Sequence, residues 1–225
     1  RTGYSDIYGQ RIDREGNALW DKNGKPLVIG EWDIYYPNAV SDGNGGIIVT
    51  WSDGRGTQND IYAQRYDGDG EELWTENGVA VCTADNDKWE TAISEDGNGG
   101  AFIAWEDHRG ITNVDIFAQH IDATGTPSWT VDGVPVCDFG ERQSDPRISH
   151  DGSGGALVAW SDRRGPSYKI YCQHVEPDGD FSWTEDGIIV SDQGGPQYGP
   201  KIAPDGDDGI MLFWEQGVIS YNIHG

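Results

Sequence analysis

Tryptophan recurs in this chain at a nearly constant interval, and that interval constrains the fold more than any other feature. One set, spaced by 54, 55 and 54 residues, consists of Trp51, Trp105, Trp160 and Trp214. A second set has the same spacing and consists of Trp20, Trp74, Trp129 and Trp183. A fixed period of this length indicates one supersecondary unit copied about four times. Residues found in every copy are expected to build the copy, so function is expected where the copies differ.

Each repeat consists of short apolar runs separated by turn residues. Residues 42–46 (Asp-Gly-Asn-Gly-Gly) and their copies separate two β-branched runs and predict a hairpin. Residues 60–64 (Asp-Ile-Tyr-Ala-Gln) and their copies predict a third strand, and the turn at Asn77-Gly78 precedes a fourth. No window has the apolar period of a helix, and 33 of the 225 residues are glycine. We therefore predict an all-β chain of four-stranded antiparallel repeats.

A four-stranded sheet cannot bury both of its faces alone, so the copies are expected to stack as a β-propeller. A β-solenoid or a β-sandwich array is the alternative, but solenoid repeats are usually much shorter. We expect one domain over residues 1–225, with repeats at about 1–36 (partial), 37–90, 91–145, 146–199 and 200–225 (partial). Four blades are expected if the N- and C-terminal strands pair within one blade and close the ring, and five blades, two of them incomplete, are the alternative.

The chain is strongly acidic, with 39 acidic and 15 basic residues and a net charge of −24. This charge argues against nucleic acid or an anionic membrane as a partner, and no apolar run suggests membrane insertion. Most of the aspartates lie in turn motifs, so solvated turns explain the acidity most simply. We expect an extracellular or cell-surface location. Cys82 and Cys137 share a repeat position on neighbouring units, too far apart for a disulfide, so free thiols are predicted.

The repeat as a whole resembles a known family. Its consensus is Asp-Gly-x-Gly-Gly, Trp-x-Asp-x-Arg-Gly, Asp-Ile-Tyr-Ala-Gln and Asp-x-x-Gly-x-x-x-Trp, in that order. It is similar to repeats of large secreted or surface-anchored proteins of bacteria and archaea, and the similarity covers essentially the whole chain. The resemblance implies a β-propeller, often found beside adhesion modules or sorting signals. It implies no single activity.

The Trp-x-Asp-x-Arg-Gly motif is complete in three copies and lost in the fourth. Its arginines could form a ring that binds a carboxylate ligand, as in sialidase propellers. Recurrence in every complete copy instead favours one structural Asp–Arg pair in each blade. On that interpretation the structural residues are Trp51, Asp53, Arg55, Trp105, Asp107, Arg109, Trp160, Asp162, Arg164 and Trp214.

Two acidic turns raise the question of calcium, because carboxylates are the ligands that this ion prefers. The residues concerned are Asp67, Asp69, Asp205 and Asp207. Neither turn fits the twelve-residue calcium loop, so a structural turn is the first interpretation and a weak calcium site the alternative. No other cofactor is expected, because the histidines and cysteines lack zinc spacing and no phosphate-binding loop is present.

The copies diverge at a position occupied by Tyr35, Trp89, Ser144 and Tyr198. In a propeller this position would recur around one face of the ring, where aromatic rings stack on sugars or anchor protein interfaces. Candidate ligand-binding residues are Trp32, Tyr35, Tyr36, Trp89 and Tyr198. Packing between blades is the alternative, and complete burial of Trp89 would exclude the site.

These observations predict a non-enzymatic recognition or adhesion propeller that binds a glycan or protein partner at the cell surface. The alternative is a structural subunit of a surface assembly or filament, which would self-associate through terminal strands such as residues 218–225. A sialidase-like glycoside hydrolase is the third hypothesis. It would need a close pair of non-equivalent carboxylates, and the sequence singles out no such pair, so no catalytic residue is assigned.

Overall fold

The computed structural model describes residues 3–110, 113–206 and 209–217, in which all regular structure is β. Three sheets have four antiparallel strands each. The first contains β3 (Ile34–Ser41), β4 (Ile47–Asp53), β5 (Asp60–Tyr66) and β6 (Val79–Cys82). The second contains β7 (Lys88–Glu95), β8 (Ala101–Asp107), β9 (Asp115–Ile121) and β10 (Val134–Cys137). The third contains β11 (Gln143–His150), β12 (Ala156–Asp162), β13 (Lys169–Val175) and β14 (Ile188–Ile189).

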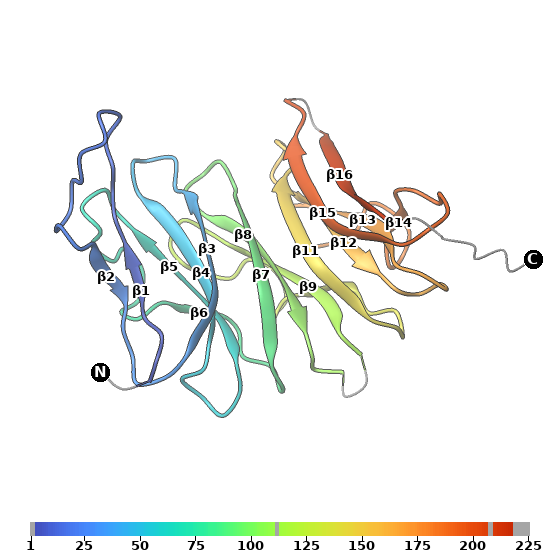
Figure 1. Ribbon diagram of the computed structural model, residues 1–225, viewed down its shortest axis with the longest axis horizontal. Helices are drawn as coiled ribbons and strands as arrows, with labels where there is room; N and C mark the ends of the chain where they lie inside the picture. Colours follow the sequence, from blue (N-terminus) through green and yellow to red (C-terminus); the bar gives the residue numbers. More distant parts are fainter. Residues whose placement is uncertain (1–2, 111–112, 207–208, 218–225) are drawn as a thin grey trace, which may run out of the picture.

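Two further sheets have two strands each. They pair β1 (Ile7–Gly9) with β2 (Lys25–Val28), and β15 (Gln197–Pro204) with β16 (Ile210–Gln216). The sheets follow one another in a row, in which β3, β7, β11 and β15 each pack against the next, and the two-stranded sheets lie at opposite ends (Figure 1). The all-β, four-stranded prediction is confirmed. Among the described strands no pairing joins β1–β2 to β15–β16, so closure of the ring is not seen.

The described part of the chain contains no helix long and apolar enough to span a membrane. The three cysteines are free and buried, as Cys82 and Cys137 on outer strands and Cys172 on β13. Burial is the largest cause that raises the pKa of Cys82 to about 12. The thiols are therefore protonated and packed as apolar side chains.

Tight turns precede the fourth strands, and packing explains their glycines. Asn77 and Gly78 have φ values of 64° and 88°, in the left-handed region that favours Asn and Gly. A Cβ atom on Gly78 would lie 2.8 Å from the indole ring of Trp51. The same contact recurs at Gly133 with Trp105. The turn therefore needs glycine both for its backbone and for the ring stacked on it.

A buried cluster of tryptophan, aspartate and arginine fixes each complete sheet. In the second sheet the Trp105 indole N–H donates to Asp107 Oδ2 at 2.8 Å. Arg109 donates through Nε and Nη2 to the two Asp107 oxygens at 2.9 and 2.7 Å, and its guanidinium lies 3.7 Å from the centroid of Phe117. Trp105 and Asp107 are fully buried. The equivalent clusters are Trp51–Asp53–Arg55 and Trp160–Asp162–Arg164.

The second tryptophan set joins neighbouring sheets. The indole N–H of Trp74 donates to the Ala123 carbonyl at 3.0 Å, and that of Trp129 donates to the Pro177 carbonyl at 3.1 Å. Apolar side chains fill the space between the sheets, and one buried cluster includes Phe102, Trp129 and Trp160. Each large side chain buried in this way contributes roughly 1.5–3 kcal/mol. One tryptophan set thus stabilises a sheet and the other stabilises a junction.

The Trp–Asp–Arg cluster makes a measurable contribution to stability. We expect Asp107→Ala to lower the free energy of unfolding by about 3–5 kcal/mol, because it removes the counter-ion of the half-buried Arg109 guanidinium and the acceptor of the buried Trp105 indole N–H. Gln216 occupies the same repeat position in the degenerate fourth copy and is exposed. Gln216→Ala should therefore cost at most about 1 kcal/mol. Denaturant unfolding of both variants checks this, and equal losses would contradict a structural role for the cluster.

Candidate functional site

The first strands of four sheets, β3, β7, β11 and β15, are interrupted at the same place. Its pairing with the second strand shifts after Tyr35, Trp89, Ser144 and Tyr198. The residues that follow are Tyr36, Glu90, Asp145 and Gly199, with φ between 49° and 56°. Three of these four are not glycine, and a left-handed backbone is uncommon for such residues. Irregularities of this kind re-aim side chains and are concentrated at functional sites.

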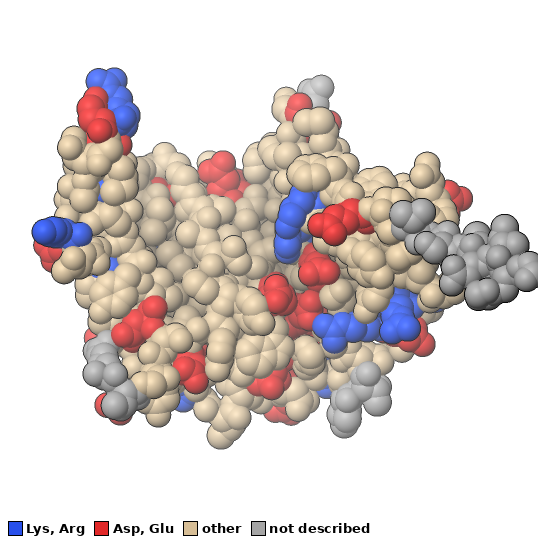
Figure 2. Space-filling view, viewed as in Figure 1, with Lys and Arg blue, Asp and Glu red and all other residues tan. Residues whose placement is uncertain are grey.

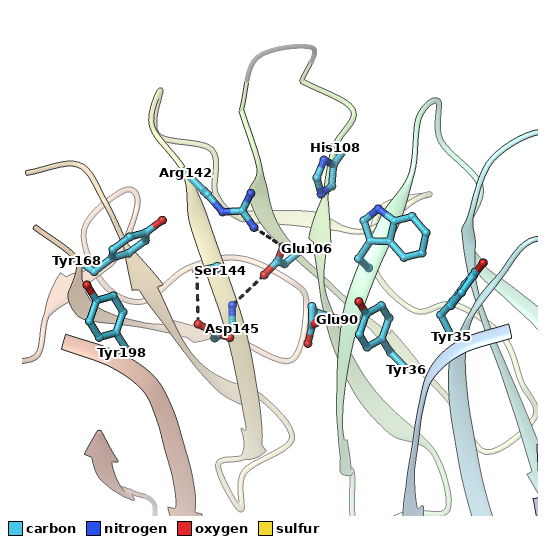
Figure 3. A pocket seen from close by; sticks show the side chains of 11 residues that line it. Tyr35, Tyr36, Glu90, Glu106, His108, Arg142, Ser144, Asp145, Tyr168 and Tyr198 are labelled. Atoms are coloured by element: carbon cyan, nitrogen blue, oxygen red, sulfur yellow. Dashed lines mark hydrogen bonds and ion pairs between the residues drawn. The ribbon is translucent and has the colours of Figure 1, made fainter. Parts of the chain in front are cut away.

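These interruptions surround an open pocket of about 710 Å³. Its lining comes from four consecutive sheets and consists of Tyr35, Tyr36, Trp89, Glu90, Glu106, His108, Arg142, Ser144, Asp145, Tyr168 and Tyr198 (Figure 3). On the face seen in Figure 2, acidic side chains gather near the middle of the molecule, over β7 and β11. The pocket is therefore centred on the second and third sheets.

Aromatic rings form two sides of the pocket. Tyr35 and Tyr36 lie on one side and Tyr168 and Tyr198 on the other, with the acidic residues between them (Figure 3). The Trp89 ring meets Tyr35 edge to face at a centroid distance of 5.3 Å. The centroids of Tyr168 and Tyr198 are 5.4 Å apart. Trp89 is half-buried. Its complete burial, which would have excluded the site, is therefore not observed.

Glu106 lies between the two aromatic sides and is 4% exposed. Its Oε1 accepts the Asp145 backbone N–H at 3.0 Å, and its Oε2 lies 3.2 Å from Arg142 Nη2. Burial raises the pKa of the Glu106 carboxyl, and the hydrogen bond and Arg142 offset this only in part. The charges of Glu90 and Asp145 raise it further. Glu106 therefore holds its proton at a higher pH than an ordinary glutamate does.

Glu106 also differs from the residue at the same position in the other two complete copies. Ser52 and Ser161 occupy the same position in the neighbouring copies. In those copies the serine hydroxyl forms a hydrogen bond with the next sheet. Ser52 donates to the Lys88 carbonyl at 2.6 Å, and Ser161 accepts the Gly199 N–H at 3.2 Å. Glu106 makes the equivalent hydrogen bond by accepting the Asp145 N–H, and its carboxyl also lines the pocket. The carboxyl is not needed for the junction, since serine is sufficient there.

The sequence predicted part of this site. Tyr35, Tyr36, Trp89 and Tyr198 are brought together as expected. Trp32 lies instead in a neighbouring, more polar pocket of about 490 Å³, which Tyr35 also lines. Sequence reasoning missed Glu90, Glu106, His108, Arg142, Asp145 and Tyr168. The signal that could have found Glu106 was the replacement of serine inside an otherwise regular motif.

The proposed calcium residues are not gathered at one place. The Asp67 carboxylate accepts the backbone N–H groups of Asp69 and Glu71, both at 2.9 Å, and so closes its own turn. Asp205 accepts the Gly209 N–H at 3.3 Å in another turn, and Asp207 lies outside the described residues. Within the described ranges no three His, Cys, Asp or Glu side chains are grouped to hold a metal ion. Residues 218–225, the suggested pairing strand, also lie outside the described residues.

Comparison with known proteins gives similarity in structure alone. No protein-family model and no curated protein matches the chain, so the resemblance to surface-protein repeats stays a prediction. The endo-arabinase from Bacteroides thetaiotaomicron VPI-5482 superposes with a TM-score of 0.46 and 12% identity, over 88% of this chain and 76% of that one. A thermostable family-43 glycoside hydrolase superposes with a TM-score of 0.45 and 14% identity, over 82% and 66%.

The expectation of a non-enzymatic recognition or adhesion propeller is corrected at this point. Both of these solved structures are enzymes by their descriptions, one an endo-arabinase and the other a family-43 glycoside hydrolase. The pocket also contains what the sequence did not reveal, namely a buried carboxyl with a raised pKa beside two further carboxylates. At such low identities and TM-scores the likeness concerns the general arrangement of strands. An activity for this chain has to be argued from its own residues.

The pocket's electrostatics predict a stability effect at Glu106. Because the pKa of this group is raised on folding, its contribution to stability is complete at low pH and is lost as pH rises through that pKa. Glu106→Gln removes the buried charge, so it should stabilise the protein by about 1 kcal/mol at pH 7.5 and have little effect at pH 4. Denaturant unfolding at the two pH values measures the difference.

The same position in the fourth copy provides the control. Glu215 is exposed, and Glu215→Gln should leave stability within about 0.5 kcal/mol at both pH values. A loss of stability in Glu106→Gln at pH 7.5 would show that the carboxylate is structural.

Proposed function

We propose that this protein is a glycoside hydrolase whose active site is the aromatic-lined pocket at the first strands of its sheets. The observation that carries the proposal is Glu106: a buried carboxyl with a raised pKa, placed where the other complete copies have serine. A carboxyl that retains its proton in a buried pocket is suited to act as the general acid at a glycosidic oxygen.

Glycosidic bond cleavage needs a second carboxylate near the first. Glu90 and Asp145 line the same pocket, one on β7 and one on β11, and both are half-buried. Their left-handed backbones, with φ of 51° and 56°, turn the side chains at the two interruptions. Either carboxylate could stabilise the positive charge that develops on the sugar or activate the attacking water. Glu106 would then supply the proton to the leaving group.

The surrounding residues indicate the kind of substrate. Tyr35, Tyr36 and Trp89 on one side, with Tyr168 and Tyr198 on the other, offer ring faces at two separate places. Sugar rings carry apolar faces that stack on aromatic side chains. An open pocket with two aromatic sides fits a carbohydrate polymer that extends past the reacting bond. Such a substrate agrees with the expected extracellular or cell-surface location.

The activity can be tested by release of reducing ends from a panel of polysaccharides. We expect hydrolysis of at least one polymer. Glu106→Gln should lower kcat by a factor of about 100 to 10,000 through loss of the acid. Trp89→Ala should raise KM about tenfold, because one stacking surface is lost. Glu215→Gln, at the matched repeat position, should leave both constants unchanged.

Comparison of Glu90→Gln with Asp145→Asn assigns the second carboxylate. The variant with the larger fall in kcat identifies it. Absence of any hydrolysis by the folded protein, or equal rates for the wild type and Glu106→Gln, would overturn the proposal.

We also propose how the row of sheets closes. β1–β2 corresponds to the third and fourth strands of a repeat, and β15–β16 corresponds to the first and second. If these two sheets joined, they would form one four-stranded blade and the ring would have four blades. If each belonged to its own blade, the ring would have five. In the complete sheets Ile48 pairs with Arg65 and Leu157 pairs with His174. The same register places Met211 opposite Arg11.

A paired cysteine substitution tests this closure. If the two end sheets pair as one blade, Met211→Cys combined with Arg11→Cys should form an intramolecular disulfide under mild oxidation, detected as a monomer with faster migration on non-reducing gels; if they stay at opposite ends of the row, as in Figure 1, none should form. Met211→Cys alone is the control and should form none. Disulfide-linked dimers without the intramolecular product would contradict the four-bladed ring.

A further inference from the structure

The same backbone hydrogen bond joins each complete sheet to the next. The N–H of the first residue in β7, β11 and β15 donates to the carbonyl just before β5, β9 and β13. The three bonds are Lys88 to Asn59 at 2.9 Å, Gln143 to Val114 at 2.8 Å and Gln197 to Tyr168 at 2.9 Å. The first residues of the strands joined in this way are Lys88 and Asp60, Gln143 and Asp115, and Gln197 and Lys169. In the first pair the two side chains are in direct contact.

An ammonium group occupies the first of these junctions. Lys88 is fully buried, and its Nζ lies 3.1 Å from Asp60 Oδ1. The ammonium also donates to the Ala84 carbonyl. A buried carboxylate is thus neutralised by a buried cation, as burial of charge requires.

The third junction also holds an ammonium. Lys169 donates to the Gly195 carbonyl at 3.0 Å and to the Gln193 carbonyl. Gln197 Oε1 accepts the Ile170 N–H at 3.2 Å, so its amide oxygen is satisfied.

The middle junction has the carboxylate without the ammonium. Asp115 is 7% exposed and Gln143 is fully buried. Asp115 Oδ1 and Gln143 Oε1 are both buried without a hydrogen-bond partner among the described residues. The Gln143 amide nitrogen donates to the carbonyls of Phe139 and Glu141, at 3.2 and 2.8 Å. Reversing the amide would set its oxygen against two carbonyls, so the orientation is fixed.

These two oxygens have no charge to face. Burial is the largest cause that raises the pKa of Asp115 to about 6, and the charges of Asp138 and Asp107 add to it. Arg109 opposes the rise but is bound to Asp107. Two buried acceptors without a donor are costly, and native structures normally satisfy such groups with water or an ion.

We propose that the junction of β9 and β11 is a binding site for a monovalent alkali-metal cation, with Asp115 Oδ1 and Gln143 Oε1 as protein ligands. The cation would take the place that the Lys88 ammonium holds in the preceding junction. Phe139, whose carbonyl corresponds to that of Ala84, lies at the same site. One unpaired carboxylate balances one positive charge, and oxygen ligands suit a hard ion.

The site bears on the pocket through the chain itself. Gln143 directly precedes Ser144 and Asp145, which line the pocket. A cation bound at Gln143 would hold the start of β11 and thereby the interruption that carries Asp145. The inference does not depend on the proposed hydrolase activity, since it concerns the junction alone.

Thermal unfolding in different chloride salts tests the proposal. At pH 7.5 and constant ionic strength, potassium or sodium chloride should raise Tm above its value in tetramethylammonium chloride. The shift should be about 5 °C once the cation exceeds its dissociation constant a hundredfold. Gln143→Lys, which copies Lys88, should raise Tm in tetramethylammonium chloride and remove the response to potassium. Lys88→Gln should enlarge the response by creating a second site.

Asp115→Asn provides a second test if the lysine variant fails to fold. Its amide can donate to Gln143 Oε1, so the protein should be stable and insensitive to the choice of cation. A rubidium soak should show anomalous density beside Asp115 in the wild type. Equal Tm values in all salts, a response that persists in Asp115→Asn, or stabilisation by calcium alone would overturn the proposal.

Discussion

The buried carboxylate of the Trp–Asp–Arg cluster is the interaction on which the rest of this structure depends. In the second sheet Asp107 receives the indole N–H of Trp105 on its own strand and the guanidinium of Arg109 just beyond it. Arg109 also donates to the Asp132 carbonyl in the turn before β10, and it lies over Phe117 on β9. One fully buried carboxylate thereby holds together two strands and a turn. Such an anchor explains why so short a set of residues recurs in every complete copy.

Because the Trp–Asp–Arg cluster holds each sheet, the residues between its members can vary from copy to copy. Residue 105 packs against the preceding sheet, and residue 106 faces the next sheet because strand side chains alternate. Serine is enough at that position for contact with the next sheet, as Ser52 and Ser161 show. Glu106 adds a buried acid there without disturbing the cluster on either side. The neighbouring interruptions of β7 and β11 then bring Glu90 and Asp145 into the same pocket.

The features that every copy repeats could be predicted from the sequence, and the features that depend on differences between copies could not. The tryptophan period, the Asn-Gly turns and the aromatic position of Trp89 follow from spacing and turn chemistry, and the four-stranded sheets agree with them. The left-handed backbones of Glu90 and Asp145 are not marked by glycine in their own copies, and only the fourth copy has glycine there, as Gly199. Glu106 stands out because its carboxyl is buried, and burial of a single residue cannot be predicted from the residue pattern. Closure of the ring depends on how chain ends meet in space, which local sequence does not specify.

The buried thiols have a consequence for how the stack of sheets comes apart. Arg109 Nη2 donates to Cys82 Sγ at 3.4 Å, and Arg164 Nη2 donates to Cys137 Sγ at 3.3 Å, each reaching into the preceding sheet. A protonated, buried thiol does not react with alkylating agents until its surroundings open. The rate at which each cysteine is alkylated thus reports how readily one junction between sheets opens. The order in which Cys82 and Cys137 become modified would reveal whether the junctions between sheets open one by one or together.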